Sequence, residues 1–182
     1  MSSYDMKKIV LLSRKSFLAK IQTHIAKIEI NKIKKNIIDI HYSSSVGDKD
    51  LSAKAWEQHG FGIFTNSLSK KLVSKEADVV VHSYKDLPVK NLNKTSFVCL
   101  KREDPRDIIL IKRSSLNKKK LVIGTSSPRR KYYLKKLKEF LPYQELKSIQ
   151  IRGNVPSRLE KVLNSSKEDG LFIAKAAIDR IL

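Results

Sequence analysis

Short apolar runs, most of them rich in β-branched residues, alternate along this chain with stretches whose apolar residues recur every three or four positions. Runs of the first kind predict buried strands, and the spacing of the second kind predicts amphipathic helices. The predicted strands are residues 7–12, 37–42, 78–82, 96–100, 107–111, 121–124, 148–151 and 170–174. The predicted helices are a first one containing Leu18, Ile21, Ile25 and Ile28, then 63–75, 128–140 and 155–163, and a last one opening after 174. This alternation is typical of an α/β fold with mostly parallel sheets flanked by helices.

Length and composition limit the possible number of domains and the classes of protein to which the chain can belong. The 182 residues suffice for one large domain or two small ones, and no apolar run approaches the length of a membrane span. The apolar stretch near the start is too short for a signal peptide, so no targeting segment is visible. The single cysteine, Cys99, excludes a disulfide framework and a cysteine-cluster metal site, and no metal is predicted. Its place in the predicted strand 96–100 indicates a buried thiol.

The formal net charge of +20 favours an acidic partner, because 38 Lys and Arg face 18 Asp and Glu. Most of the excess is lysine in tracts typical of solvated helix faces and loops. The arginines are fewer and lie in short, unusual contexts. Nucleic acid is the less favoured partner, because no aromatic stacking platform or basic recognition helix accompanies the charge.

Charged side chains follow the first group of predicted strands. Arg14 and Ser16 come after strand 7–12, and "HSYKD" follows strand 78–82 with Ser83, Lys85 and Asp86. Ligands of open α/β sheets bind outside the carboxyl ends of strands. A carboxylate held among cations at such a place can stabilise a cationic intermediate or accept a proton from a nitrogen heterocycle.

Two further clusters combine arginines with a helix start. In "GTSSPRR", Gly124 ends a strand, Thr125, Ser126 and Ser127 offer hydroxyls and an N-cap, and Pro128 suits the first helical position before Arg129 and Arg130. In "IRGNVPSR", Arg152 ends a strand, Gly153 permits a turn, Asn154 can cap the helix and Arg158 lies in its first turn. Two arginines at a helix N-terminus are unfavourable for the helix dipole, and a bound anion is the expected compensation.

These stretches, in this order, resemble the hydroxymethylbilane synthase family, also called porphobilinogen deaminases. The matching segments are "SRKSFLAKIQ", "HSYKDLPV", "REDPRD", "GTSSPRR", "IRGNVPSRLEK" and the closing "DGLFIAKAAIDRI". The resemblance implies condensation of four porphobilinogen molecules into hydroxymethylbilane with release of ammonia, in tetrapyrrole (haem) biosynthesis. It also implies a dipyrromethane cofactor held covalently by a cysteine of a third domain, which Cys99 does not match.

The resemblance also assigns roles to individual residues. It implies that Asp86 is the catalytic carboxylate, which contacts pyrrole N–H groups and stabilises the cation left after ammonia departs. The implied substrate-binding residues are Arg14, Ser16, Arg129, Arg130 and Arg152. The implied cofactor-binding residues are Ser83, Lys85, Thr125, Ser127, Arg129, Arg130, Asn154 and Arg158.

The family fold implied by the resemblance is two-lobed and similar to a type-2 periplasmic binding protein. Domain one would be residues 1–103 and most of domain two 107–182, with the charged segment 101–107 as the crossover and the third, cofactor-carrying domain absent from this chain. A monomer located in the cytoplasm or a plastid, with no nucleic acid or membrane partner, is expected.

A non-catalytic two-lobed binding module for a small polycarboxylate or other anion is the alternative. The segment "HGFGIF" (59–64) favours it, because Phe61 stands where the family has a lysine. Retention of Asp86 and of both arginine pairs favours the enzyme.

Overall fold

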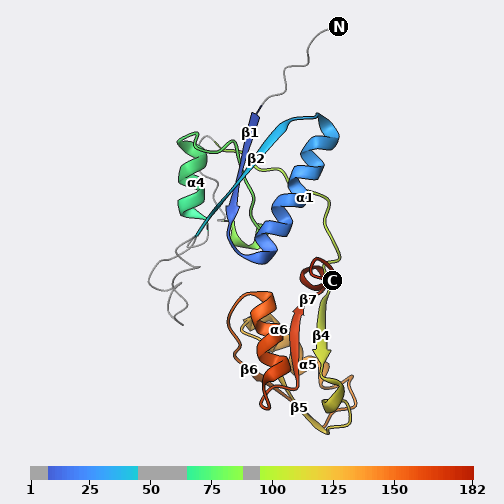
Figure 1. The fold of residues 1–182 in the computed structure, drawn as a ribbon. Helices are drawn as coiled ribbons and strands as arrows, with labels where there is room; N and C mark the ends of the chain where they lie inside the picture. The colour runs from blue at the N-terminus through green and yellow to red at the C-terminus, as the bar shows by residue number, and fades with distance from the viewer. Residues whose placement is uncertain (1–7, 45–64, 88–94) are drawn as a thin grey trace. The chain divides into compact units, whose positions relative to one another are not determined.

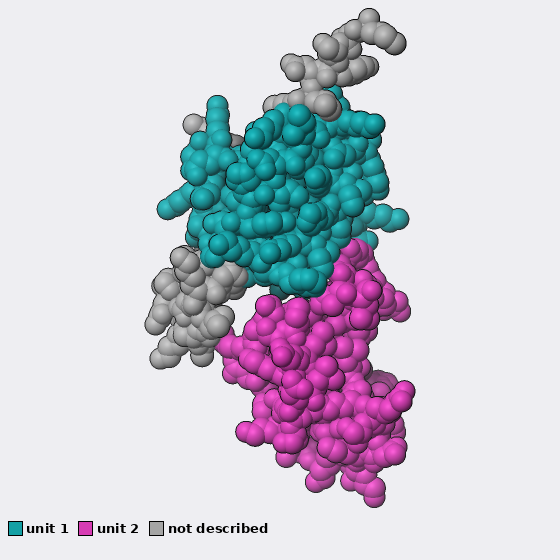
Figure 2. Space-filling model, viewed as in Figure 1, with its two compact units in different colours: residues 1–102 teal, residues 103–182 magenta. Residues whose placement is uncertain are grey.

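The computed structural model describes residues 8–44, 65–87 and 95–182 of the chain (Figure 1). The chain divides into two compact units, residues 1–102 and 103–182 (Figure 2), and each unit has its own sheet. The altered segment 59–64 lies outside the described residues. Within the described part of the chain, no helix has the length and apolar character needed to cross a membrane.

Unit 1 is built on a parallel three-stranded sheet in the order β2-β1-β3. Its elements are β1 (Lys8–Arg14), α1 (Phe17–Ile33), β2 (Ile37–Ser43), α4 (Asn66–Val73), β3 (Val79–Val80) and the short 3₁₀ helix η1 (Tyr84–Asp86). Helices α1 and α4 lie on opposite sides of β1 in Figure 1. Successive strand residues point to opposite faces of a sheet, so Leu12 packs on Leu68 of α4 while the neighbouring Ser13 meets Thr23 of α1.

Unit 2 has a four-stranded sheet in the order β4-β7-β5-β6. Its elements are β4 (Asp107–Ile111), the 3₁₀ helix η2 (Arg113–Ser115), β5 (Lys120–Gly124), α5 (Pro128–Leu137), β6 (Glu145–Ile149), α6 (Val155–Asn164), β7 (Gly170–Ala174) and α7 (Lys175–Asp179). Strands β5, β6 and β7 are parallel, and β4 runs antiparallel to β7. The predicted α/β class with mostly parallel sheets and flanking helices is confirmed.

The two faces of the unit 2 sheet carry separate apolar cores. Phe172 of β7 packs with Ile123 and Leu134 on the α5 face, whereas Leu171 and Ile173 pack on the opposite face with residues of α6 and α7. Strand β7 begins at Gly170, where a Cβ atom would lie 2.3 Å from the carbonyl oxygen of Leu110. The close approach of β4 and β7 therefore requires glycine at this position.

The expected strand at 96–100 is wrong. The segment forms no ladder, and within the described residues no strand pairs with it. Val98 is 90% exposed, and Cys99 is exposed rather than buried in a core. An apolar run indicates a strand only when a neighbouring strand is there to receive its hydrogen bonds.

Other boundaries also differ from the predicted ones. The 78–82 strand shrinks to Val79–Val80 and is half-buried rather than buried on both faces, because in the described residues only β1 pairs with it. Strand 148–151 is displaced to Glu145–Ile149, since its partner β5 ends at Gly124 opposite Ile149. Ile151 lies beyond the end of β6 and packs in the apolar core. Arg152 therefore does not end a strand as predicted, but lies three residues after the last residue of β6. Helix 128–140 ends at Leu137.

A buried carboxylate anchors the loop that precedes β7. Asp169 is 5% exposed and accepts hydrogen bonds from the Ser115 hydroxyl (2.7 Å), the Lys118 ammonium (2.7 Å) and the Val122 backbone N–H (2.8 Å). Burial alone would raise the pKa of Asp169, but these hydrogen bonds together lower it below its ordinary value. Its stabilising contribution is therefore present above the ordinary carboxyl pKa and is lost as the pH falls through the folded value.

We expect Asp169→Ala to lower the free energy of unfolding of unit 2 by about 2–4 kcal/mol, because it leaves the buried Ser115 hydroxyl and the Val122 N–H without their acceptor. Urea unfolding at neutral pH measures this loss. The control is Asp179→Ala, which removes only a solvent-accessible partner of Lys175 and should cost at most about 0.5 kcal/mol. Equal losses in both variants would contradict the anchoring role.

Candidate functional site

The carboxyl end of β1 brings a cation to the edge of the unit 1 sheet. Arg14 is the last residue of β1, and Asp86 lies in η1, which follows the neighbouring strand β3. The Arg14 Nη1 and Asp86 Oδ2 atoms are 3.8 Å apart, and both side chains are about four-fifths buried. The structure thus brings together the two residues predicted to face the substrate and perform its chemistry.

A histidine that the sequence-based site omitted lies beside this ion pair. The His82 Nε2 atom is buried and has no hydrogen-bond partner. Burial lowers the pKa of His82; the charge of Asp86 raises it and the charge of Arg14 lowers it, with a net value below the ordinary 6.5. The imidazole is therefore neutral at neutral pH and adds no charge next to Asp86.

Helix α1 holds both strand ends through its own polar side chains. The Thr23 hydroxyl lies 2.7 Å from the buried Ser13 hydroxyl, next to Arg14. The Ser83 hydroxyl donates to the Gln22 side-chain oxygen at 3.0 Å. Thr23 and Gln22 were not predicted, because their partners Ser13 and Ser83 lie on other elements.

The remaining predicted residues of unit 1 are placed less tightly. Ser16 is the N-cap residue of α1 but makes no side-chain capping hydrogen bond. Lys85 is exposed on η1. Both side chains are accessible to a ligand, and the structure gives neither of them a fixed contact with Asp86.

The turn after β5 is built as predicted. The Ser127 side chain caps α5 by accepting from the Arg130 backbone N–H at 3.4 Å, and Pro128 occupies the first helical position. Thr125 is 2% exposed, and its hydroxyl lies 3.3 Å from the Ser127 backbone nitrogen. Ser126 donates to the carbonyl of Ile151 at 2.5 Å, which ties this turn to the chain after β6.

The chain itself supplies a counter-charge for the double arginine. Asp107 Oδ1 accepts from Arg130 Nε (3.1 Å) and Nη2 (2.9 Å), and Asp107 Oδ2 lies 2.6 Å from Arg129 Nη1. Burial raises the pKa of Asp107, but the hydrogen bonds and charges of Arg130 and Arg129 lower it by more, to below its usual range. The expectation that a bound anion must compensate the helix dipole is therefore corrected, because a resident carboxylate already does so.

The turn after β6 supplies the second arginine pair. Gly153 has φ of 117°, a conformation that favours glycine, and Asn154 caps α6 by accepting from the Ser157 backbone N–H at 2.9 Å. Arg152 is exposed, whereas Arg158 is half-buried and donates from Nε to the Gly153 carbonyl at 2.7 Å. The predicted turn and cap are confirmed.

Three guanidiniums of unit 2 lie close enough to repel one another. The pKa of Arg158 is lowered first by burial and then by the positive charges of Arg130 and Arg152. Within the described residues, the Arg158 side chain donates only from Nε, to the Gly153 carbonyl, so its Nη groups remain available. The Arg158 guanidinium is half-buried, lies among like charges and has available N–H donors, so it is suited to bind a carboxylate or phosphate.

An apolar cavity on the α5 face does not compete as the anion site. Its volume is about 380 Å³, and its lining includes Ile109, Leu121, Leu141 and Phe172, with Asp107 as its sole charged residue among those described. A carboxylate placed there would lose hydration beside the negative charge of Asp107, among mostly apolar side chains.

Comparison with known proteins identifies the family to which the chain belongs. Residues 9–182 match the family model described as "Porphobilinogen deaminase, dipyromethane cofactor binding domain". The chain belongs to the porphobilinogen deaminase family.

Among its relatives, the porphobilinogen deaminase of Ruminiclostridium cellulolyticum is 36% identical over 178 residues, which are 97% of this chain and 59% of the relative. The probable porphobilinogen deaminase of Picrophilus torridus is 37% identical over 173 residues, or 93% and 58% of the two chains. The enzyme of Synechococcus sp. (strain CC9902) is 36% identical over 179 residues, or 94% and 55%. The chain therefore spans somewhat more than half the length of these porphobilinogen deaminases.

The neutral state of His82 predicts a pH dependence of stability. Its folded pKa lies below 6.5, so the contribution of the neutral imidazole is complete above the unfolded pKa and is lost as the pH falls through 6.5 toward the folded value. We expect His82→Asn to flatten the decline in unfolding free energy between about pH 7 and pH 5.

Urea titrations across that range measure the effect. His24→Asn is the matched control, because His24 is exposed and, among the described residues, its ring hydrogen-bonds to Tyr42. A wild-type decline that persists unchanged in His82→Asn would contradict the assignment.

Proposed function

We propose that the protein carrying this chain is a hydroxymethylbilane synthase, which condenses four porphobilinogen molecules and releases ammonia at each step. The observation that carries the proposal is the excess of guanidinium groups at the carboxyl edge of unit 2. There, within the described residues, Asp107 is the one carboxylate that pairs with Arg129 and Arg130, and Arg158 lies close to the positive charges of Arg130 and Arg152. Porphobilinogen bears an acetate and a propionate, so a growing pyrrole chain presents many carboxylates.

The donor chemistry of the same cluster fits a dipyrromethane. When bound, that group supplies a pyrrole carbon to which the next ring is joined, and it carries carboxylates of its own. Arg158 would bind a carboxylate through its available Nη groups, and Arg129, Arg130 and Arg152 would bind others. Thr125, Ser127 and Asn154 would complete the polar lining of this cluster, and Ser83 and Lys85 are the proposed cofactor-binding residues of unit 1. The cysteine that anchors the group would belong to a third domain, because Cys99 does not match the cofactor cysteine that the family resemblance implies.

Asp86 is the proposed catalytic residue. Its carboxylate lies 3.8 Å from the Arg14 guanidinium, and both side chains are about four-fifths buried. An ionised Asp86 can accept hydrogen bonds from pyrrole N–H groups and stabilise the positive charge that develops as ammonia leaves. Arg14 and Ser16 would bind the carboxylates of the incoming substrate.

The proposed architecture is two-lobed and similar to a type-2 periplasmic binding protein. Domain one would comprise residues 1–103 and domain two 107–182, joined by the charged segment that contains Pro105. The parallel sheets with helices on both faces support this proposal. We also propose a monomer located in the cytoplasm or a plastid.

The decisive variant is Asp86→Asn, made in the natural protein that contains this chain. We expect porphobilinogen consumption to fall at least about 10²-fold, because the amide cannot stabilise a developing cation or accept a proton. Binding of porphobilinogen, measured by calorimetry, should persist because the arginines are untouched.

Glu76→Gln is the control, since it removes one negative charge from an exposed site of the same unit and should leave turnover unchanged. Retained turnover in Asp86→Asn would overturn the catalytic role. Wild-type binding without turnover would instead support the anion-binding module.

A further inference from the structure

We propose that Asp107 is a positioning residue that divides the arginine pair into a fixed guanidinium, Arg130, and a releasable one, Arg129. The inference rests on the proposed function only for the identity of the ligand, a pyrrole carboxylate. None of the sequence motifs assigned a role to Asp107, because it begins a strand rather than ending one.

The contacts of the two arginines with Asp107 are unequal. Arg130 donates through both Nε and Nη2, and its side chain is only 15% exposed. Arg129 approaches Asp107 with Nη1, 2.6 Å from Oδ2, and its side chain is 59% exposed. Two donors on a buried side chain fix the plane of a guanidinium, whereas one contact on an exposed side chain is exchanged readily with water or another anion.

Asp107 is itself held rigidly. It is the first residue of β4 and lies opposite Ala174 in the antiparallel ladder with β7, and its side chain is 12% exposed. Because β4 runs antiparallel, its first residue lies at the same sheet edge as the carboxyl ends of β5 and β7. The anchoring carboxylate therefore belongs to an edge strand of the sheet and not to the α5 turn.

This geometry determines how a ligand carboxylate enters the cluster. Arg130 is already oriented and lies near Arg158, whose Nη groups are available. An incoming carboxylate competes with Asp107 for Arg129 and leaves the contact between Asp107 and Arg130 in place. Asp107 thus lowers the ordering cost of binding at Arg130 and holds Arg129 until a ligand arrives.

Arginine labelling with phenylglyoxal, followed by peptide mass spectrometry, tests the division without any ligand. In the wild-type chain we expect Arg129 to react at least about fivefold faster than Arg130, and added porphobilinogen to protect Arg129. In Asp107→Asn, the labelling rate of Arg130 should rise about tenfold, toward that of Arg129. Equal wild-type rates for the two arginines would overturn the proposal, and this comparison does not depend on the variant folding.

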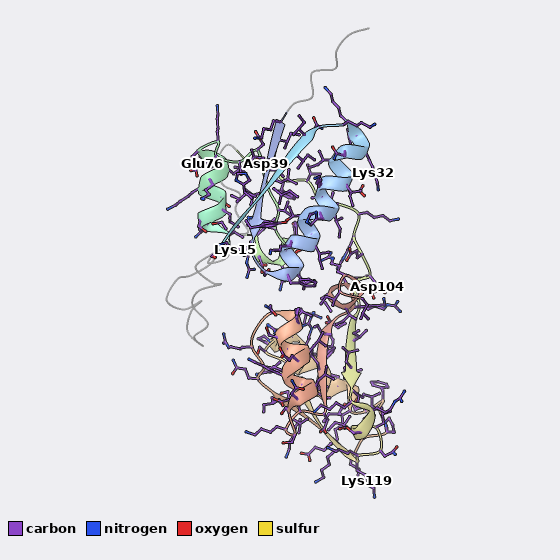
Figure 3. All side chains as sticks on the ribbon, in the orientation of Figure 1. Lys15, Lys32, Asp39, Glu76, Asp104 and Lys119 are labelled. Carbon is purple, nitrogen blue, oxygen red and sulfur yellow. The ribbon has the colours of Figure 1, made fainter. Side chains whose placement is uncertain are left out.

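Asp104→Asn is the matched control. Asp104 lies beside the start of β4 (Figure 3) and pairs with the exposed Arg106, so its loss changes the net charge equally without touching the arginine pair. It should leave the labelling rate of Arg130 unchanged. An increase as large as that in Asp107→Asn would contradict a specific role for Asp107.

The sign of the change in porphobilinogen affinity provides a second readout. Removing a negative charge should by itself strengthen anion binding slightly, as we expect in Asp104→Asn. Loss of positioning should instead weaken binding in Asp107→Asn, by about tenfold. Tighter binding in Asp107→Asn would overturn the positioning role. If the labelling contrast holds but porphobilinogen does not bind the wild-type chain, the positioning role stands and the proposed function fails.

Discussion

Parallel pairing of β5 with β6 is the constraint on which the candidate site of unit 2 depends. The two strands end in register at Gly124 and Ile149, so the turns that follow them meet at one edge of the sheet. Each turn opens a helix and places arginines there, Arg129 and Arg130 on α5 and Arg158 on α6. The antiparallel strand β4 then brings Asp107 to the same edge. No single turn would concentrate this charge without the ladder that aligns them.

The energetic problem at this edge is like-charge repulsion, and the structure solves it only in part. Asp107 neutralises one charge and offsets the unfavourable helix dipole at the start of α5. Arg158 remains half-buried among positive charges, with a pKa lowered by burial and by its neighbours. The residual excess of positive charge is the property that a polycarboxylate ligand would relieve. In unit 1 the charges are balanced, because Arg14 faces Asp86 and the neutral His82 adds no charge.

Much of this arrangement could be predicted from local sequence patterns. Strands 107–111 and 170–174 were predicted with their observed bounds, as were the caps at Ser127 and Asn154, because apolar periodicity and capping chemistry act within a few residues. The predictions that were wrong or missing concern residues whose structure depends on a partner elsewhere in the fold. The 96–100 run lacks a ladder partner among the described residues, and β6 is displaced because the end of β5 determines where pairing stops. Asp107, His82, Gln22 and Thr23 were missed for the same reason, since the contacts that define them join elements distant in sequence. The lysines behave as predicted: Lys32 and Lys119 are exposed on the surfaces of their units (Figure 3).

The central claim is that the arginines at the carboxyl edge of unit 2 bind the carboxylates of pyrroles. The most direct test follows the ¹⁵N–¹H signals of arginine Nε groups by NMR during titration with porphobilinogen. The account predicts that the signals of Arg130 and Arg158 shift in a saturable manner, while the signal of Arg113, an exposed arginine in η2, stays in place. Equal small shifts of all three signals, or no shift of the first two, would contradict it.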